Sequence, residues 1–150
     1  MTDATTEPTV DERFGWYRTT VVEAEVAPGR TVRLTGAGAV GEWPFPGAVV
    51  VLTAYNPGAA RPDRATNEAA NDRLADAIRT LGARFVPGTG TAPDGSHAEP
   101  SLVVVGLPRD DGVLLGRWFG QDAIFEIDAT MVRLVSCCDD RVEEWRRITA

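Results

Sequence analysis

The side chains best suited to recognising a small ligand are uncharged amides and a phenol, joined by one carboxylate. They are Tyr55, Asn56, Asn67, Asn71, Glu99 and Gln121. Amides both donate and accept hydrogen bonds and can therefore orient a polar ligand, while a carboxylate can accept a ligand N–H or act as a base. Such a set suits recognition of a metabolite better than neutralisation of a strong charge.

Tyr55 and Asn56 end the most apolar run of the chain. Residues 48–55 (AVVVLTAY) have the length of a strand and do not alternate with polar residues, which predicts a central strand buried on both faces. In an open sheet, ligands gather beyond the carboxyl ends of strands. We therefore expect Tyr55 and Asn56 to contact a ligand.

Asn67 and Asn71 lie on a helix predicted over residues 67–81. At 100° per residue they continue the stripe of Leu74 and Ile78, the apolar face expected to pack on the core. A buried amide without a partner costs about 1–3 kcal/mol, so both side chains need partners. They either cap neighbouring loops and satisfy backbone carbonyls, or contact a ligand at the positive end of the helix dipole.

A glycine-rich segment, residues 88–100, predicts a flexible loop beside the same site. Gly88 and Gly90 resemble a phosphate-cradling loop only in part, because no helix follows them at once. Glu99 precedes a second buried strand and is a candidate base in a cleft, where it would activate water for hydrolysis or group transfer; the alternative is an ordinary exposed glutamate. Ser101, which begins that strand, joins the expected ligand contacts.

The rest of the pattern predicts the fold. Thr66 is the expected N-cap of the first helix, and a second helix is expected from about 109 to 119, closed by Gly120. Gln121, directly after it, is a capping amide or a ligand contact. Further strands are expected over residues 17–26, 31–34, 84–87, 123–127 and 131–135, and a short amphipathic helix after 139.

These elements indicate an α+β fold with a mostly antiparallel, mixed sheet of about six to seven strands and two main helices on one face. We expect a disordered leader over residues 1–12 and a single domain over 13–150. Four aromatic residues, Trp16, Trp43, Phe45 and Trp145, are candidate anchors for a protein partner. For Trp43 and Phe45 we favour the alternative that they seal the open face of the sheet.

Composition excludes several kinds of chemistry. The formal net charge of −7 and the scattered arginines weigh against a nucleic-acid partner, which a basic stripe would normally bind. The chain has no lysine, which excludes a Schiff-base lysine, a pyridoxal-phosphate enzyme and a Walker-type phosphate loop. No apolar run is long enough to span a membrane, and the first residues are not a signal peptide, so we expect a cytoplasmic protein.

Histidine and cysteine are too scarce for the common catalytic and metal sites. The one histidine, His97, has no nucleophile-elbow sequence near it, so we expect no serine–histidine–carboxylate triad. One histidine and two adjacent cysteines, Cys137 and Cys138, do not make a zinc site, and we expect two free thiols there. We predict no metal and no cofactor.

Five motifs in order are similar to a known family. They are TAYNP at 53–57, the asparagines at 67 and 71 with Leu74, PGTG at 87–90, EPS at 99–101 before a strand ending in Gly106, and FGQDAI at 119–124. The region from about 48 to 135 resembles the bacterial domain-of-unknown-function family 3293. The resemblance implies that Tyr55, Asn56, Asn67, Asn71, Glu99 and Gln121 are pattern residues, and it implies no activity. His97 stands where family members often have tryptophan, which lowers its standing as a general catalyst.

The leading hypothesis is therefore a domain that binds a small polar or anionic metabolite, with nucleotide-like molecules among the ligands considered. The site would lie at the end of the 48–55 strand and the N-terminus of the 67–81 helix. The alternative is a protein-interaction or regulatory module without catalysis, with a protein partner or a homodimer.

Overall fold

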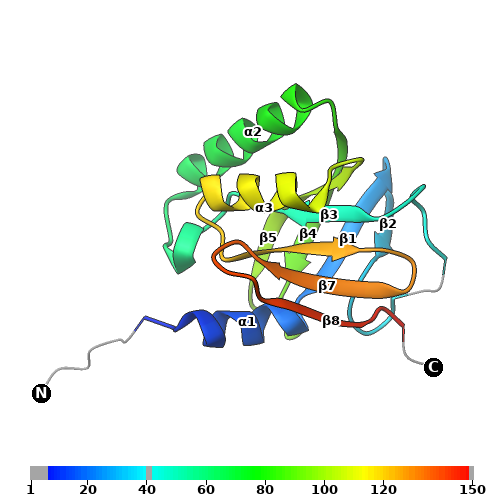
Figure 1. The fold of residues 1–150 in the computed structure, drawn as a ribbon, viewed down its shortest axis with the longest axis horizontal. Helices are drawn as coiled ribbons and strands as arrows, with labels where there is room; N and C mark the ends of the chain where they lie inside the picture. Colours follow the sequence, from blue (N-terminus) through cyan, green and yellow to red (C-terminus); the bar gives the residue numbers. More distant parts are fainter. Residues whose placement is uncertain (1–6, 40–41, 149–150) are drawn as a thin grey trace, which may run out of the picture.

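The computed structural model describes residues 7–39 and 42–148, which form an antiparallel sheet and three α-helices. The eight strands are β1 (Val21–Ala27), β2 (Arg30–Arg33), β3 (Val49–Leu52), β4 (Arg84–Thr91), β5 (Ala98–Val105), β6 (Ala123–Ile127), β7 (Met131–Ser136) and β8 (Val142–Arg146). Their order in the sheet is β2-β1-β4-β5-β3-β6-β7-β8. The helices are α1 (Val10–Thr19), α2 (Arg64–Thr80) and α3 (Arg109–Trp118) (Figure 1).

Strand β3 is central, as its apolar run predicts. It pairs with β5 on one side and β6 on the other, and all four of its residues are buried. The regular pairing ends at Leu52, so Thr53, Ala54, Tyr55 and Asn56 form a loop instead of continuing the strand. This loop is where the predicted site begins.

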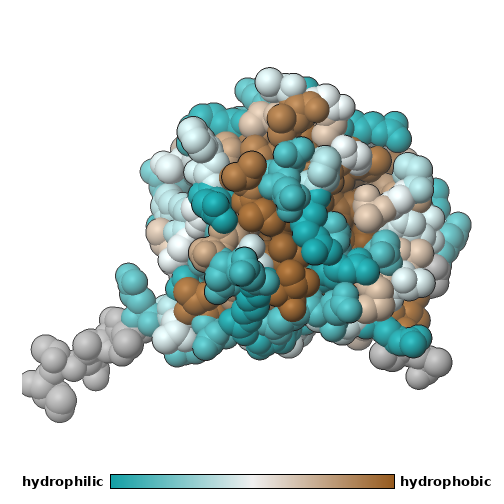
Figure 2. Space-filling model, viewed as in Figure 1, coloured by the Kyte–Doolittle hydropathy of each residue, from teal (hydrophilic) through white to brown (hydrophobic). Residues whose placement is uncertain are grey.

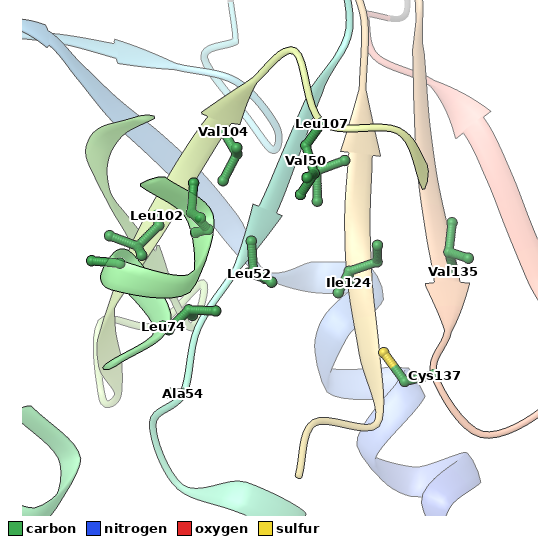
Figure 3. Packing of buried hydrophobic residues seen from close by; sticks show 12 residues of the cluster. Val50, Leu52, Ala54, Leu74, Leu102, Val104, Leu107, Ile124, Val135 and Cys137 are labelled. Atoms are coloured by element: carbon green, nitrogen blue, oxygen red, sulfur yellow. The ribbon is translucent and has the colours of Figure 1, made fainter. Parts of the chain in front are cut away.

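Helices α2 and α3 pack on the same face of the sheet, as expected. Leu74 and Ile78 of α2 meet Leu52 and Val104 in one buried cluster, shown in Figure 3. Helix α3 comes close to the strands because two of its positions are glycine. A Cβ atom at Gly116 would lie 2.5 Å from the Sγ atom of Cys137, so a larger residue would force the helix away from the sheet.

The other face of the sheet is covered differently. A second cluster, including Val49, Val51 and Val103, is covered in part by the side chains of Trp43 and Phe45. The two rings meet edge to face with centroids 5.4 Å apart, and the Trp43 indole donates to the Gly47 carbonyl. These two aromatic residues therefore seal the sheet, as favoured from the sequence.

Helix α1 lies away from α2 and α3, next to β8 (Figure 1). Its sequence shows little separation of apolar and polar faces, and Phe14 is its one fully buried residue. Contacts between charged side chains join it to β8: Arg18 donates to Glu143, and Arg141 donates to Asp11. The sequence pattern did not predict this helix.

Several expected elements differ in the structure. The 88–100 segment is not a flexible loop but most of a β4–β5 hairpin, because paired strands continue through Thr91 and resume at Ala98. The segment after 139 contains strand β8 instead of a helix. Helix α2 begins at Arg64, because Asp63 and not Thr66 caps it.

The count of strands is therefore eight instead of six to seven, and a third helix joins the two expected. Of the expected leader, residues 1–6 lie outside the described part of the chain, and residues 10–12 are already helical. None of the helices in the described ranges has the length and apolarity needed to cross a bilayer.

Candidate functional site

A cavity of about 570 Å³ opens between α1, the β4–β5 hairpin and the loop after β3. Its polar wall contains Tyr55, Asn56, Glu99, Ser101 and Gln121. Its floor is apolar and comes from the sheet, with Val22, Val51, Phe125 and Leu134. A cavity of this size, with an apolar floor and a few polar groups, is typical of small-molecule sites.

The polar wall is built around the carboxylate of Glu99. Its Oε1 atom accepts a hydrogen bond from the Asn56 amide at 3.2 Å. The Asn56 oxygen in turn accepts from the amide of Asn67 at 2.9 Å, and the Asn67 oxygen accepts from the backbone N–H of Asn56 at 3.0 Å. The Asn56 amide therefore orients the Glu99 carboxylate, and Asn67 in turn holds Asn56.

Asn56 adopts a left-handed backbone conformation, which is uncommon for residues other than glycine. With φ of 47° it is the one non-glycine residue at positive φ within the described ranges. Asparagine tolerates the left-handed region better than most residues, but the conformation still costs energy. Here it turns the chain after β3 so that the Asn56 side chain reaches both Asn67 and Glu99.

Asn71 and Gln121 hold the loop after β3 through hydrogen bonds to its backbone. The Asn71 oxygen accepts from the backbone N–H of Ala54 at 2.8 Å, and the Gln121 amide donates to the Tyr55 carbonyl at 3.1 Å. Gln121 also lines the cavity, whereas Asn67 and Asn71 do not. The two asparagines thus bond to the neighbouring loop, and they bind mainly its N–H groups, not the carbonyls expected.

The glycine-rich motif divides between two roles. Gly90 lines the cavity beside Ser101, which is buried. Gly88 does not line the cavity, and a Cβ atom there would lie 2.7 Å from Val103 and 3.0 Å from the Glu23 carbonyl. Glycine is needed at position 88 for strand packing, so the pair is not arranged as a phosphate cradle.

The sequence pattern did not predict that His97 contacts Glu99. Its Nε2 atom lies 3.3 Å from the Oε2 atom of Glu99. The spacing of the two residues along the hairpin could have indicated this contact, but only if residues 88–100 had been predicted as strands rather than a loop. Asn56 therefore contacts one carboxylate oxygen of Glu99, and His97 lies beside the other.

Helix α1 supplies a wall that the sequence did not predict. Trp16, Tyr17 and Arg13 line the cavity from this helix. Arg13 donates to both carboxylate oxygens of Asp122, at 2.5 and 3.0 Å, and the Tyr17 hydroxyl donates to the same carboxylate at 2.7 Å. Asp122 itself is buried, directly before β6.

These contacts set the charges on this wall. Burial opposes the ionised form of Asp122, yet the hydrogen bonds from Arg13 and Tyr17 lower its pKa below the ordinary value. Burial raises the pKa of Tyr17, and the neighbouring Asp122 carboxylate raises it further. The wall therefore holds a carboxylate and a guanidinium that neutralise each other, with a protonated phenol between them.

The described residues contain no group of three or more histidine, cysteine, aspartate or glutamate side chains placed to hold a metal ion. The two cysteines are free thiols, as expected, and burial raises the pKa of Cys137 to about 12.

Residues 52–124 match the family model described as "Protein of unknown function (DUF3293)". This segment resembles that family. No curated protein and no solved structure matches the chain. The resemblance expected over residues 48–135 is thereby confirmed across most of its length.

The matched segment and the rest of the chain make different parts of the cavity. The polar wall, from Tyr55 to Gln121, lies within the DUF3293 segment. Helix α1, Val22 and Leu134 lie outside it. Asp122 belongs to the segment and bonds to Arg13 and Tyr17 of α1, so it connects the segment to this wall.

Proposed function

We propose that this chain is a small-molecule-binding domain whose ligand occupies the cavity between α1 and the β4–β5 hairpin. The observation that carries the proposal is the Glu99 carboxylate, held between Asn56 and His97 on the cavity wall. The Asn56 amide, itself held by Asn67, orients this carboxylate, as a group that meets a ligand in one geometry requires.

The residues proposed to contact the ligand are a subset of those expected from the sequence. Tyr55, Asn56, Glu99, Ser101 and Gln121 line the cavity, together with Gly90. Asn67 and Asn71 act behind them by fixing the loop that carries Tyr55 and Asn56. Catalysis by Glu99, with a water molecule as its partner, stays a prediction.

The geometry supports a polar ligand better than a phosphate. Asp63 caps the N-terminus of α2 by accepting from the backbone N–H of Thr66 at 2.8 Å. A carboxylate at that position repels a second anion, which removes the usual attraction of a helix N-terminus. Together with the packing role of Gly88, this disfavours the nucleotide-like ligands among those considered.

The proposal is tested by a metabolite screen with a variant that fills the cavity. Adenosine, ribose 5-phosphate, arginine, tyrosine and citrate would be titrated into ¹⁵N-labelled protein, and changes in amide chemical shifts would be mapped. Ala123 lines the cavity, so Ala123→Phe should abolish binding. Ala69→Phe, on the exposed side of α2, is the matched control. Binding that survives Ala123→Phe would contradict the proposal.

An apolar patch on the helices supports self-association as a second candidate function. Trp118 is 85% exposed, Leu114 is 59% exposed and Leu81 is 52% exposed, and the three lie around one shallow depression at the α2–α3 surface. Figure 2 shows hydrophobic residues exposed on the face that carries these helices. The first turn of α3 carries Asp110 and Asp111, and its first residue, Arg109, is already paired with Glu126. The last turn carries Arg117, so two copies packed antiparallel would bring opposite charges together.

In this second proposal, a second copy of the chain covers the apolar patch of α2 and α3. Light scattering at rising protein concentration should show a dimer, and Trp118→Ser should return the protein to the monomer. Trp16→Ser, which alters another exposed tryptophan, is the control. A monomer at all concentrations would exclude the dimer.

A further inference from the structure

The charged side chains that line the cavity differ in whether an ion pair with an oppositely charged side chain neutralises them. On α1, Arg13 donates to both oxygens of Asp122 and also to the Pro8 carbonyl at 2.7 Å. The Tyr17 proton is directed to Asp122 as well. This wall therefore carries no net charge, because Arg13 is paired with Asp122 and Tyr17 donates to the same carboxylate.

The opposite wall carries the carboxylate of Glu99, whose side chain is only 25% exposed. Each carboxylate oxygen can accept about two hydrogen bonds. In the described structure one oxygen has Asn56 as its donor and the other has His97 beside it. Capacity for a further donor remains on the cavity side.

The negative charge of Glu99 acts on Tyr17, on the other wall of the cavity. After burial and the Asp122 carboxylate, Glu99 is a further cause of the raised pKa of Tyr17. Two other charged residues, Arg61 and Asp94, also line the cavity; both are exposed at its edge, and Asp94 accepts from the backbone N–H of Ser96. Solvent screens charges at such positions. Glu99 is therefore the half-buried charge of the cavity that is not paired with an arginine.

Aromatic rings line the same cavity as this carboxylate. Trp16, Tyr17, Tyr55 and Phe125 line the same cavity as Glu99. A carboxylate combined with aromatic faces is the chemistry that recognises an ammonium group, through a charge-assisted hydrogen bond and cation–π attraction. The apolar floor adds a surface for a hydrocarbon group attached to the nitrogen.

We propose that the ligand of this cavity is a primary amine attached to an aromatic or branched apolar group, with its ammonium bound by Glu99 and its apolar part on the floor of Val51 and Phe125. This inference rests on the proposed function and specifies the class of ligand. It assigns Glu99 the role of a specificity determinant, whether or not a reaction follows binding.

Two probes that share a skeleton and differ in charge test the inference. Phenethylamine and 3-phenylpropionate, each at millimolar concentration, would be titrated into ¹⁵N-labelled wild-type protein. Phenethylamine should bind at least about tenfold more tightly, a difference of about 1.4 kcal/mol. The amides of Asn56, Gly90 and Gln121 should shift. Equal or tighter binding of the carboxylate probe would overturn the inference, and this comparison needs no variant.

Glu99→Gln then isolates the charge, because the side chain keeps its shape. It should weaken phenethylamine binding about tenfold or more, while Glu144→Gln, at an exposed position on β8, should leave it unchanged. Unaltered binding in Glu99→Gln would overturn the inference. If neither probe binds but the metabolite screen finds a cavity ligand, the amine inference fails and the proposed function stands; if both screens are negative, both fail.

Discussion

Helices α1 and α2 both support the cavity, but they are attached to the sheet by different forces. Helix α2 buries Leu74 and Ile78 in the core and sends Asn67 and Asn71 to the loop after β3. Helix α1 buries Phe14 and is otherwise attached by hydrogen bonds and ion pairs, chiefly at Asp122 and Glu143. Burial of apolar area involves no protonation and is not weakened by ionic screening, whereas ionic contacts depend on both.

The difference indicates that the polar wall with Glu99 is held in place under most solution conditions, whereas the attachment of the α1 wall depends on pH and salt. The wall that holds Glu99 is supported by core packing, and the α1 wall depends on the charge state of a few groups. Conditions that weaken ion pairs should therefore loosen α1 before they affect the Glu99 site.

The largest effect is expected where α2 enters the core. Leu74→Ala should lower the free energy of unfolding by about 2–5 kcal/mol, because it leaves a cavity in a fully buried cluster. Urea denaturation followed by circular dichroism measures the change. Leu114→Ala, at an exposed position on α3, should stay within about 0.5 kcal/mol. Equal effects of the two variants would show that α2 is not anchored as described.

The next largest effect concerns the junction of the two walls. Asp122→Asn should lower stability by about 2 kcal/mol, because it leaves Arg13 without its partner charge in a largely buried setting. Hydrogen exchange should accelerate across α1 and remain slow in α2. If exchange rises equally in both helices, α1 is not a separately attached wall.

The same carboxylate predicts a dependence on pH. The pKa of Asp122 is lower in the folded state than its ordinary value of 3.8. Its contribution to stability is therefore fully present above that ordinary value and is lost as pH falls through the folded pKa. The stability difference between wild type and Asp122→Asn should shrink below about pH 4. A difference that grows on acidification would contradict the assigned ion pair.

A smaller effect separates strain from side-chain contact at Asn56. Asn56→Ala loses the side-chain hydrogen bonds to Glu99 and Asn67 and keeps the unfavourable positive φ. Asn56→Gly loses the same side-chain bonds, but glycine adopts a positive φ without strain. The alanine variant should be less stable than the glycine variant by about 1 kcal/mol. Thermal unfolding of the pair measures this difference. Identical midpoints would mean that the backbone turn costs nothing.

The smallest effect is expected from the exposed ion pairs of α1. Glu143→Gln removes the negative charge that pairs with Arg18 and Arg141 at a partly exposed site, so its cost should be at most about 1 kcal/mol. Molar salt should reduce that cost further in thermal unfolding. A cost unchanged by salt would indicate that packing, not charge, attaches this end of α1.

Prediction from sequence worked best where one physical signal dominates. The apolar run before Tyr55 predicted the central strand, and the stripe of Leu74 and Ile78 predicted the packing of α2. It failed where long-range pairing decides the conformation. Residues 88–100 contain turn-forming glycines and prolines, yet β1 and β5 pair with β4 and hold it extended.

The candidate site shows the same division. Its polar side chains were named from their types and their order, because amides and a carboxylate are unusual beside apolar segments. The α1 wall could not be predicted, since α1 has no amphipathic pattern and its key partner, Asp122, lies more than a hundred residues away along the chain. His97 and Glu99 were both noticed, but their contact depends on the hairpin that was expected to be a loop.

The placement of α1 also has a consequence for how the molecule is made. Ribosomes release α1 early, while its partners Asp122, Arg141 and Glu143 leave more than a hundred residues later. Contacts between such distant residues form slowly, because a long loop must close before they stabilise anything. During synthesis the floor of the cavity is therefore incomplete until β7 joins the sheet. The contacts of α1 with Arg141 and Glu143 form later still, so an emerging chain would display the Glu99 site before its α1 wall is fully attached.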